Sequence, residues 1–382
     1  MADPRFEPSM AWLRAKQGVK WSRPGPELIP AWVADMDFEV PAPIRAALTA
    51  MLDRGDLGYP DWDHDPLPGA FVTRMQRSFG WTPDADFVRP VTDLIQALQV
   101  IMFLATEPGD RIVAHLPNYP PFPAGIADMA RTLTPVRLHP DGEGWTWDAD
   151  EMDAAARGAK VLLLVNPQNP TGRVFTHTEL QQLADVAEEH DLLVISDEIH
   201  AALAYEPHVH LPFAPFAPDR TVTITSATKA YNIAGVRTAV AHVGAEWLRK
   251  RWDALPPFLL GHPNTLGVEA TLAAWRDCDD WLADLRVHLH AQRDHLAARV
   301  AELPGLSMRV PDGGYLAWID CTGAGLGGDP AGFFRANAGL ELAPGPDYDP
   351  QATDWVRLNF ATGRAVLDEI LDRMAASLGS RA

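Results

Sequence analysis

Three short apolar runs, each followed at once by polar residues, decide the fold of this chain. They are Val161–Val165 (VLLLV) before NPQNPTG, Leu192–Ser196 (LLVIS) before DEIH, and Thr221–Thr225 (TVTIT) before SATK. Apolar runs of this length, bounded by turn-forming residues, indicate strands buried on both faces, which is typical of a largely parallel sheet. We therefore expect an α/β fold built around these strands.

The segment between the first two runs predicts a helix. It reads THTELQQLADVAEEHD and begins with the residues of a capping box, Thr176 and Glu179. Apolar residues then recur at helical spacing at Leu180, Leu183 and Ala187. The three segments together predict a strand–helix–strand unit.

The two ends of the chain have a different character. Residues 1–40 are irregular and rich in Pro and Trp, which predicts an arm packed on a larger body. One or two long helices are expected within 264–302. The remainder mixes predicted strands and helices, at Tyr315–Ile319, Ala331–Ala338, Trp355–Phe360 and Arg364–Ser377. We expect an arm that forms part of a small domain (1–40), a large domain (41–263) and a small α+β domain (264–382).

Composition excludes several classes of protein. The 382 residues carry a formal charge of −19, which disfavours binding to nucleic acid. Two cysteines, Cys278 and Cys321, are too few for a disulfide framework. The N-terminal residues lack the apolar core of a signal peptide, and no run of about 18 apolar residues predicts a membrane span. We expect a cytoplasmic protein.

Reactive side chains follow the three predicted strands. Asn166 and Asn169 follow the first, Asp197 and His200 the second, and Ser226 and Lys229 the third. Ligands of open α/β sheets bind beyond the carboxyl ends of the strands, so these side chains are expected to meet in one cleft.

Such a set suits an aldehyde cofactor with a basic ring nitrogen. A desolvated lysine loses its proton more easily and can form a Schiff base with a carbonyl, which is the role expected of Lys229. An aspartate keeps the ring nitrogen protonated, which is the role expected of Asp197. Pyridoxal 5′-phosphate (PLP) is the predicted cofactor.

The motifs NPQNPTG, SDEIH and SATKAYNIAG, in this order, resemble the PLP-dependent fold type I superfamily, aminotransferase class I/II. AWVADMDFEVPAPI at Ala31–Ile44, LGYP at Leu57–Pro60 and NYPPF at Asn118–Phe122 resemble its cystathionine β-lyase (C–S lyase) subgroup more closely. The resemblance implies a large domain with a mixed, mostly parallel seven-stranded sheet flanked by helices, a smaller α+β domain, and a homodimer with shared active sites.

The resemblance also implies roles for individual residues. Lys229 would be catalytic and Arg357 would bind the substrate α-carboxylate. Further substrate contacts would come from Ala34 and Trp62. The cofactor contacts would be Asp197 at the ring nitrogen, Asn169 and His200 at the phenolic oxygen, Tyr119 on the ring face, Ser226 and Arg237 at the phosphate, Thr92, Asp93 and Leu94 as weaker contacts, and Tyr59 reaching the partner subunit's cofactor.

Two positions depart from the family pattern. Ala202 stands where C–S lyases commonly have aspartate, and Asp93 stands where the phosphate-binding segment commonly has glycine. A carboxylate at position 93 would compete with the phosphate, point away from it or contact the substrate. No metal site is expected, because His208 and His210, or His288 and His290, are better explained as solvated side chains than as ligands.

The leading hypothesis is a PLP-dependent C–S β-lyase that converts a cysteine S-conjugate or cystathionine-like thioether to a thiol, pyruvate and ammonia. An aminotransferase would use the same residues, as would a decarboxylating or oxidatively deaminating enzyme of specialised metabolism. A non-catalytic regulatory protein is disfavoured by the intact Lys229.

Overall fold

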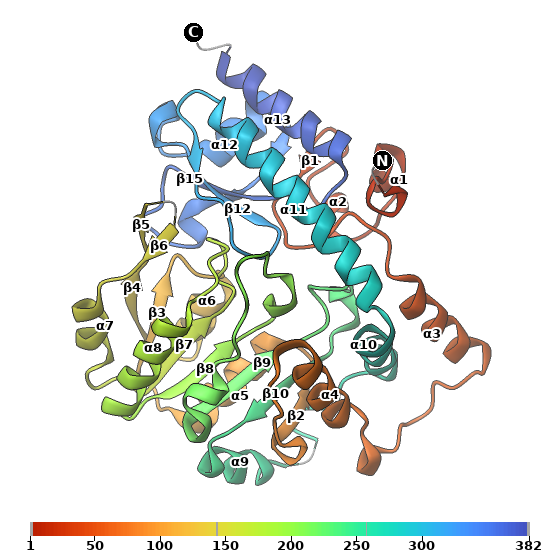
Figure 1. Ribbon diagram of the computed structural model, residues 1–382, viewed down its shortest axis with the longest axis vertical. Coiled ribbons are helices and arrows are strands. Elements are labelled where there is room, and N and C mark those ends of the chain that lie inside the picture. Colours follow the sequence, from red (N-terminus) through yellow and green to blue (C-terminus); the bar gives the residue numbers. More distant parts are fainter. Residues whose placement is uncertain (1–2, 143, 257, 380–382) are drawn as a thin grey trace.

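A seven-stranded sheet lies at the centre of the computed structural model, which describes residues 3–142, 144–256 and 258–379 (Figure 1). Its order is β2-β10-β9-β8-β7-β3-β4. The strands are β2 (Val88–Val91), β3 (Arg111–Leu116), β4 (Thr132–Arg137), β7 (Val161–Val165), β8 (Leu193–Asp197), β9 (Thr221–Thr225) and β10 (Ala239–Val243). β10 pairs antiparallel with β2 and β9, and the other neighbouring strands of this sheet pair in parallel, so the expected mixed, mostly parallel sheet is confirmed.

Helices cover both faces of this sheet. Along β7, Val161, Leu163 and Val165 pack in the apolar cluster of α5 (Leu94–Ala105), whereas Leu162 and Leu164 pack in that of α8 (His177–Glu189). Both faces need apolar side chains, and this explains the uninterrupted VLLLV run. The other α-helices and strands between residues 42 and 277 are α3 (Ala42–Asp53), α4 (Leu67–Phe79), α6 (Pro121–Asp128), α7 (Ala149–Ala156), α9 (Glu246–Asp253), α10 (Thr265–Asp277) and the hairpin β5 (His139–Asp141) with β6 (Gly144–Thr146).

Helix α8 begins at the predicted capping box. The Thr176 Oγ1 accepts a hydrogen bond from the Glu179 backbone N–H at 3.4 Å, and Glu179 Oε2 accepts one from the Thr176 N–H at 2.8 Å. Two otherwise unpaired N–H groups of the helix start are satisfied in this way, so the prediction is confirmed.

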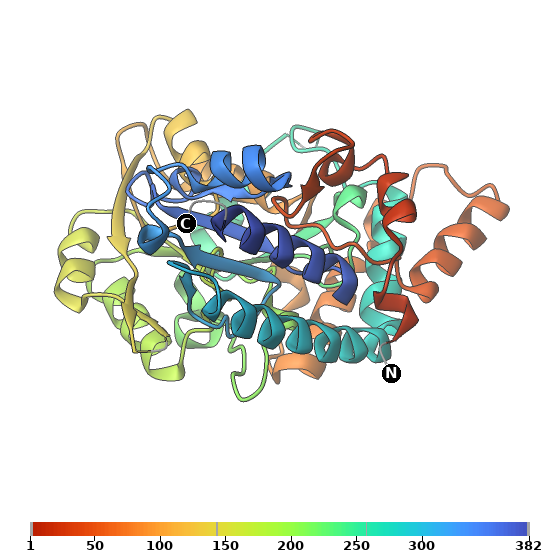
Figure 2. The same ribbon diagram turned by 90° about the horizontal axis from the view of Figure 1, so that it is seen from above.

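A second, antiparallel sheet has the order β11-β12-β15-β14. Its strands are β11 (Ser307–Met308), β12 (Leu316–Asp320), β14 (Ala343–Pro344) and β15 (Trp355–Asn359). The accompanying helices are α11 (Asp279–Ala301), α12 (Pro330–Ala338) and α13 (Arg364–Gly379). Figure 2 shows α11 and α13 side by side along this part of the molecule. The strands and helices expected here are found within two residues of their predicted ends.

The N-terminal arm contains α1 (Met10–Arg14), α2 (Val19–Ser22) and β1 (Ile29–Pro30), and β1 pairs in parallel with β13 (Leu340–Glu341). The arm therefore adds a strand to the C-terminal part of the chain. The domain boundaries at 40/41 and 263/264 stay a prediction.

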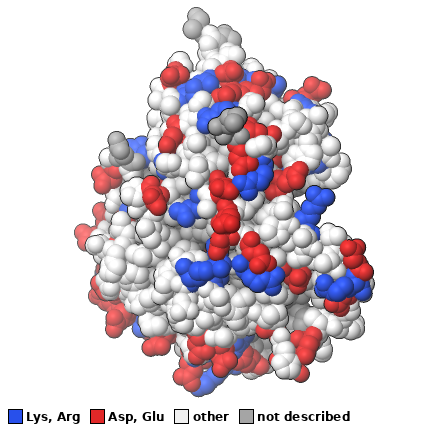
Figure 3. Space-filling model, turned by 45° about the vertical axis from the view of Figure 1, so that its right-hand side comes forward, with Lys and Arg blue, Asp and Glu red and all other residues white. Residues whose placement is uncertain are grey.

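The molecular surface carries mixed charge. Figure 3 shows acidic and basic side chains next to one another across one face of the molecule. Among the described residues, no helix combines the length and the apolar character needed to cross a bilayer.

Candidate active site

One cavity of about 140 Å³ is lined by polar residues at the ends of β7, β8 and β9, namely Asn169, Asp197, His200, Ser226 and Lys229. Asn166, which was expected among them, does not line it, and its Oδ1 accepts a hydrogen bond from the Phe175 N–H at 3.2 Å. The three strands are neighbours in the sheet and parallel, so their carboxyl ends share one edge, as the sequence predicted. Predicted site residues that line this cavity are Ala34, Thr92, Asp93, Leu94, Tyr119, Asn169, Asp197, His200, Ser226, Lys229 and Arg237.

Lys229 lines the cavity and is half-buried. Its Nζ donates a hydrogen bond to the Ala34 backbone oxygen at 2.8 Å. Burial lowers the pKa of the Lys229 ammonium, and the nearby Arg357 lowers it further, while Asp35 and Asp197 act in the opposite direction. The amine is therefore easier to deprotonate than a surface lysine.

The Asp197 carboxyl stands at the end of β8 and is 4% exposed. Its Oδ1 accepts a hydrogen bond from the Ile199 N–H at 3.0 Å. Burial raises the pKa of Asp197 from 3.8 to about 7, against the lowering effects of that hydrogen bond and of Lys229. A cationic N–H donor beside this carboxylate would relieve the cost of its burial.

The His200 ring is buried and held neutral. Burial lowers the pKa of His200 to about 3, and the charges of Lys229 and Arg357 add to the effect. The ring packs edge-on against Tyr315 at 5.8 Å between centroids. Its Nδ1 is buried near Gly314 and has no hydrogen-bond partner among the described residues.

The Arg357 guanidinium, on β15, is oriented by two acceptors. Its Nη1 donates to Asn169 Oδ1 at 3.0 Å and its Nη2 to the Trp32 backbone oxygen at 2.7 Å. The Arg357 Nε is buried and unpaired within the described part of the chain. Arg357 is thus a fixed, planar donor that lines a second cavity, which shares Tyr119 with the first, and it contacts the first cavity through Asn169.

Asp93 lies at the start of α5 and lines the cavity, so its side chain does not point away from the site. Its Oδ1 accepts from the N–H groups of Ile95 (2.8 Å) and Gln96 (2.9 Å), while Oδ2 forms an ion pair with Arg237. Thr92 Oγ1 also donates to Asp93 Oδ2, at 3.1 Å. The carboxylate thus serves as the N-cap of α5.

Tyr59, like Arg357, is a predicted site residue that does not line this cavity. Tyr59 is 96% exposed in the loop between α3 and the short helix η2 (Trp62–His64). Trp62 begins η2, but its side chain lies outside the described part of the structure.

Several residues that sequence reasoning missed hold the AWVADMDF segment against the cavity. Asn359 Nδ2 donates to the backbone oxygens of Val33 and Asp35, both at 2.7 Å. The Tyr315 hydroxyl donates to the Ala34 oxygen at 2.9 Å, the same oxygen that binds the Lys229 amine. The AWVADMDF motif is visible in the sequence, but Asn359 and Tyr315 lie hundreds of residues away from it, so no local pattern predicts these hydrogen bonds.

The histidine predictions were only partly right. His208 is exposed, but His210 is buried with its Nε2 3.1 Å from Glu198 Oε2, so its assignment as a solvated side chain is wrong. The cause is Glu198, which is itself buried within the DEIH motif and supplies a polar partner.

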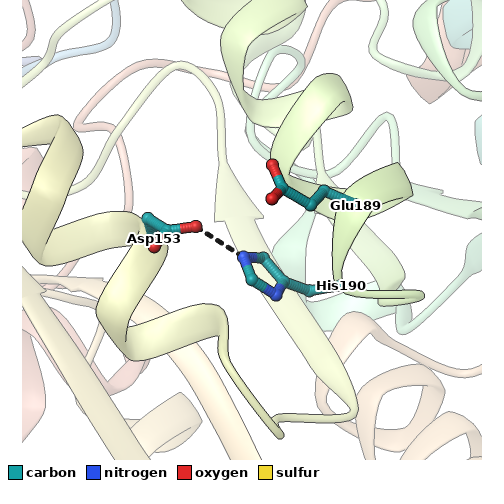
Figure 4. Close-up of side chains that lie close together, drawn as sticks. All are labelled: Asp153, Glu189 and His190. Atoms are coloured by element: carbon teal, nitrogen blue, oxygen red, sulfur yellow. Dashed lines mark hydrogen bonds and ion pairs between the residues drawn. The ribbon is translucent and has the colours of Figure 1, made fainter.

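Asp153 within α7 lies close to Glu189 and His190 at the end of α8 (Figure 4). Each has a side chain of a type that can bind a metal, and their potential ligand atoms lie within 4.8 Å of one another. Asp153 already accepts from His190 at 2.6 Å and from Arg157 at 2.8 Å. These contacts explain the cluster as a link between the two helices.

The cavity offers the donor set that PLP needs. An amine with a lowered pKa suits an aldehyde, and the buried Asp197 suits a ring nitrogen that must carry a proton. Ser226, Arg237 and the Leu94 N–H at the start of α5 suit a phosphate, and no described residue accepts a hydrogen bond from that N–H. The residues present fit the cofactor that the resemblance implies.

Comparison with known proteins supports the same assignment. Cystathionine beta-lyase of Corynebacterium glutamicum is 31% identical, over 97% of this chain and 99% of its own. The crystal structure of OvoB has a TM-score of 0.92 at 32% identity, covering 100% of both chains. The PLP-bound C-S lyase of Staphylococcus hominis has a TM-score of 0.90 at 28% identity, covering 96% of each chain. The sequence profile of aminotransferase class I and II matches residues 33–374, and the chain belongs to this family.

Proposed function

We propose that this chain is a PLP-dependent C–S β-lyase that cleaves a cysteine S-conjugate or cystathionine-like thioether to a thiol, pyruvate and ammonia. The observation that carries the proposal is the half-buried Lys229 in one cavity with Asp197 and Asn169. Full-length similarity to a cystathionine beta-lyase and to a PLP-bound C-S lyase supports this reaction.

The cofactor would be held by residues that already line the cavity. Asp197 would pair with the ring nitrogen, Tyr119 would cover the ring face, and Asn169 with His200 would face the phenolic oxygen. At the other end, Ser226 and Arg237 would bind the phosphate together with the start of α5. When bound, PLP supplies an aldehyde for the substrate amine and a protonated ring that accepts the electron pair left at the substrate Cα.

The chain's own residues supply orientation and proton transfer. Arg357 would bind the substrate α-carboxylate with its planar guanidinium, with Ala34 close by, and so fix the Cα–H bond relative to the cofactor. Lys229, with its lowered pKa, would remove the Cα proton as a general base. The departing sulfur is a fair leaving group, because a thiol pKa near 8.5 permits a thiolate at neutral pH.

A homodimer is part of the proposal. Tyr59 is almost fully exposed in a single chain, which is unusual for a large aromatic side chain and suits a contact with the phosphate of the partner subunit's cofactor. Trp62 would be a substrate contact from the same loop. The protein is proposed to act in the cytoplasm.

Borohydride reduction followed by peptide mass spectrometry tests the site, and a coupled pyruvate assay tests the reaction. We expect a reduced adduct on Lys229, its loss in Lys229→Ala, and pyruvate from cystathionine or S-alkylcysteine. Lys250→Ala is the matched control, since Lys250 lies exposed on α9. An absence of pyruvate from every thioether would remove the lyase assignment.

An aminotransferase is the second candidate, because the chain belongs to the aminotransferase class I and II family. It would return the proton to the cofactor rather than expel a group from Cβ. Conversion of the bound cofactor to its amine form by a simple amino acid, and back by a keto acid, would distinguish it from the lyase.

A further inference from the structure

A carboxylate occupies the part of the cavity that is best suited to an anion. The positive end of the α5 dipole and the Arg237 guanidinium both face this place, and both are engaged by Asp93. The Asp93 side chain is 21% exposed, so water only partly screens its charge.

The two engagements of Asp93 differ in strength. The Arg237 side chain is 63% exposed, and an ion pair with so exposed a partner is weak. Arg237 can therefore leave Asp93 for a ligand at little cost. The hydrogen bonds to the N–H groups of Ile95 and Gln96 are charge-assisted and cap the helix, so the carboxylate stays at the helix start.

We propose that Asp93 is a built-in competitor of the cofactor's phosphate, and that its negative charge weakens the binding of PLP. The inference rests on the proposed function, because it requires PLP in this cavity. Arg237 would turn to the phosphate, and the Leu94 N–H would donate to it. The Asp93 carboxylate would remain within the same helical turn and repel it. The enzyme would consequently exchange its cofactor more readily than a protein with an uncharged residue at position 93.

Asp93→Asn removes the negative charge of the side chain and keeps its role as the N-cap of α5. Asparagine is as good an N-cap as aspartate and keeps the side-chain oxygen that accepts from Ile95 and Gln96. The matched control is Asp148→Asn. Asp148 caps α7 through the same type of bond, accepting from the Glu151 N–H at 2.9 Å, and it is exposed and does not line the cavity.

The experiment dialyses the holoenzyme against graded concentrations of PLP and measures bound cofactor by absorbance. We expect Asp93→Asn to lower the dissociation constant for PLP about tenfold, the effect of one like charge at a partly exposed site. Pyridoxal, which lacks the phosphate, should bind wild type and variant equally, and Asp148→Asn should change neither constant. Added salt should reduce the difference for PLP, because it screens the repulsion.

Other outcomes overturn the inference. A dissociation constant for PLP that is unchanged or raised in Asp93→Asn contradicts it, and so does an equal gain for pyridoxal. If Asp93→Asn does not fold, Asp93→Ser provides a second neutral cap for the same comparison. Failure of the wild type to bind PLP at all would reject the proposed function as well, whereas normal binding with no effect of the charge rejects the inference alone.

Discussion

Replacing Asp197 with asparagine is expected to stabilise the protein prepared without cofactor at neutral and alkaline pH. Burial raises the pKa of this carboxyl from 3.8 to about 7. The folded protein therefore retains a proton on Asp197 between these two pH values, whereas the unfolded chain has lost it. Because the folded state binds more protons in this window, the stability of the wild type falls as the pH rises from about 4 to about 7 and stays reduced above it.

The magnitude follows from the size of the shift. The gap between 3.8 and about 7, at about 1.4 kcal/mol per pH unit, amounts to roughly 4 kcal/mol of lost stability above pH 7. Asparagine cannot ionise and can still accept the hydrogen bond from the Ile199 N–H. The variant should therefore match the wild type near pH 4 and exceed it by up to roughly 4 kcal/mol at pH 8.

Urea unfolding of both proteins between pH 4 and pH 8, at one protein concentration, measures this difference. Asp148→Asn serves as the surface control and should follow the wild type throughout. Saturating PLP should reverse the order at pH 8, because the wild-type carboxylate then gains a cationic partner. A variant that is no more stable than the wild type at pH 8, or a difference that does not change with pH, would refute the reasoning.

Three further predictions concern other parts of the molecule. Arg357→Lys should raise KM for S-alkylcysteine by about ten- to a hundredfold in steady-state kinetics, with a smaller change in kcat, because an ammonium cannot bind a carboxylate through two parallel bonds. Lys20→Met should lower the free energy of unfolding by about 3–5 kcal/mol, since Asp37, 3.0 Å from the Lys20 Nζ and 2% exposed, would lose its cationic partner and keep the hydrogen bond from the Trp21 Nε1. Lys250→Met is the control, because Lys250 pairs with Glu246 on the surface, and it should change the free energy of unfolding by less than about 1 kcal/mol. Thr176→Ala should cost about 1 kcal/mol through loss of the α8 cap, measured by urea unfolding.

The central sheet was predictable because its signals are local. VLLLV is apolar on both faces, whereas in TVTIT threonines alternate with Val222 and Ile224, and the structure buries both faces of β7, β8 and β9. The capping box before α8 needs only residues three positions apart. The convergence of Asp197 and Lys229 also followed, because parallel neighbouring strands end at one edge of a sheet.

The rest of the site depends on contacts between distant parts of the chain. Tyr315 and Lys229 share the Ala34 oxygen across sequence separations of 281 and 195 residues. No periodicity or spacing predicts such a contact. His210 was misjudged for the same reason, because only the folded chain shows that Glu198 lies buried beside it.

Asp93 shows a different limit of sequence reasoning. Its identity marked it as a departure from the family pattern, but the direction of its carboxylate depended on the competition between helix capping and the neighbouring cations. In the structure the Asp93 Oδ1 caps α5, and its Oδ2 forms an ion pair with Arg237.

The segment AWVADMDF, near the beginning of the chain, is held in place by Asn359, near its end. During synthesis on the ribosome, the strands of the central sheet are complete once Val243 has emerged, more than a hundred residues before Asn359. The nascent chain can therefore form the carboxyl ends of β7, β8 and β9 early, and at that stage Asn232 can already bind the backbone of Met36 and Phe38. The hydrogen bonds from Asn359 to Val33 and Asp35 form only after the last segment has emerged, so chains that end before Asn359 would lack these two restraints on the residues that flank Ala34.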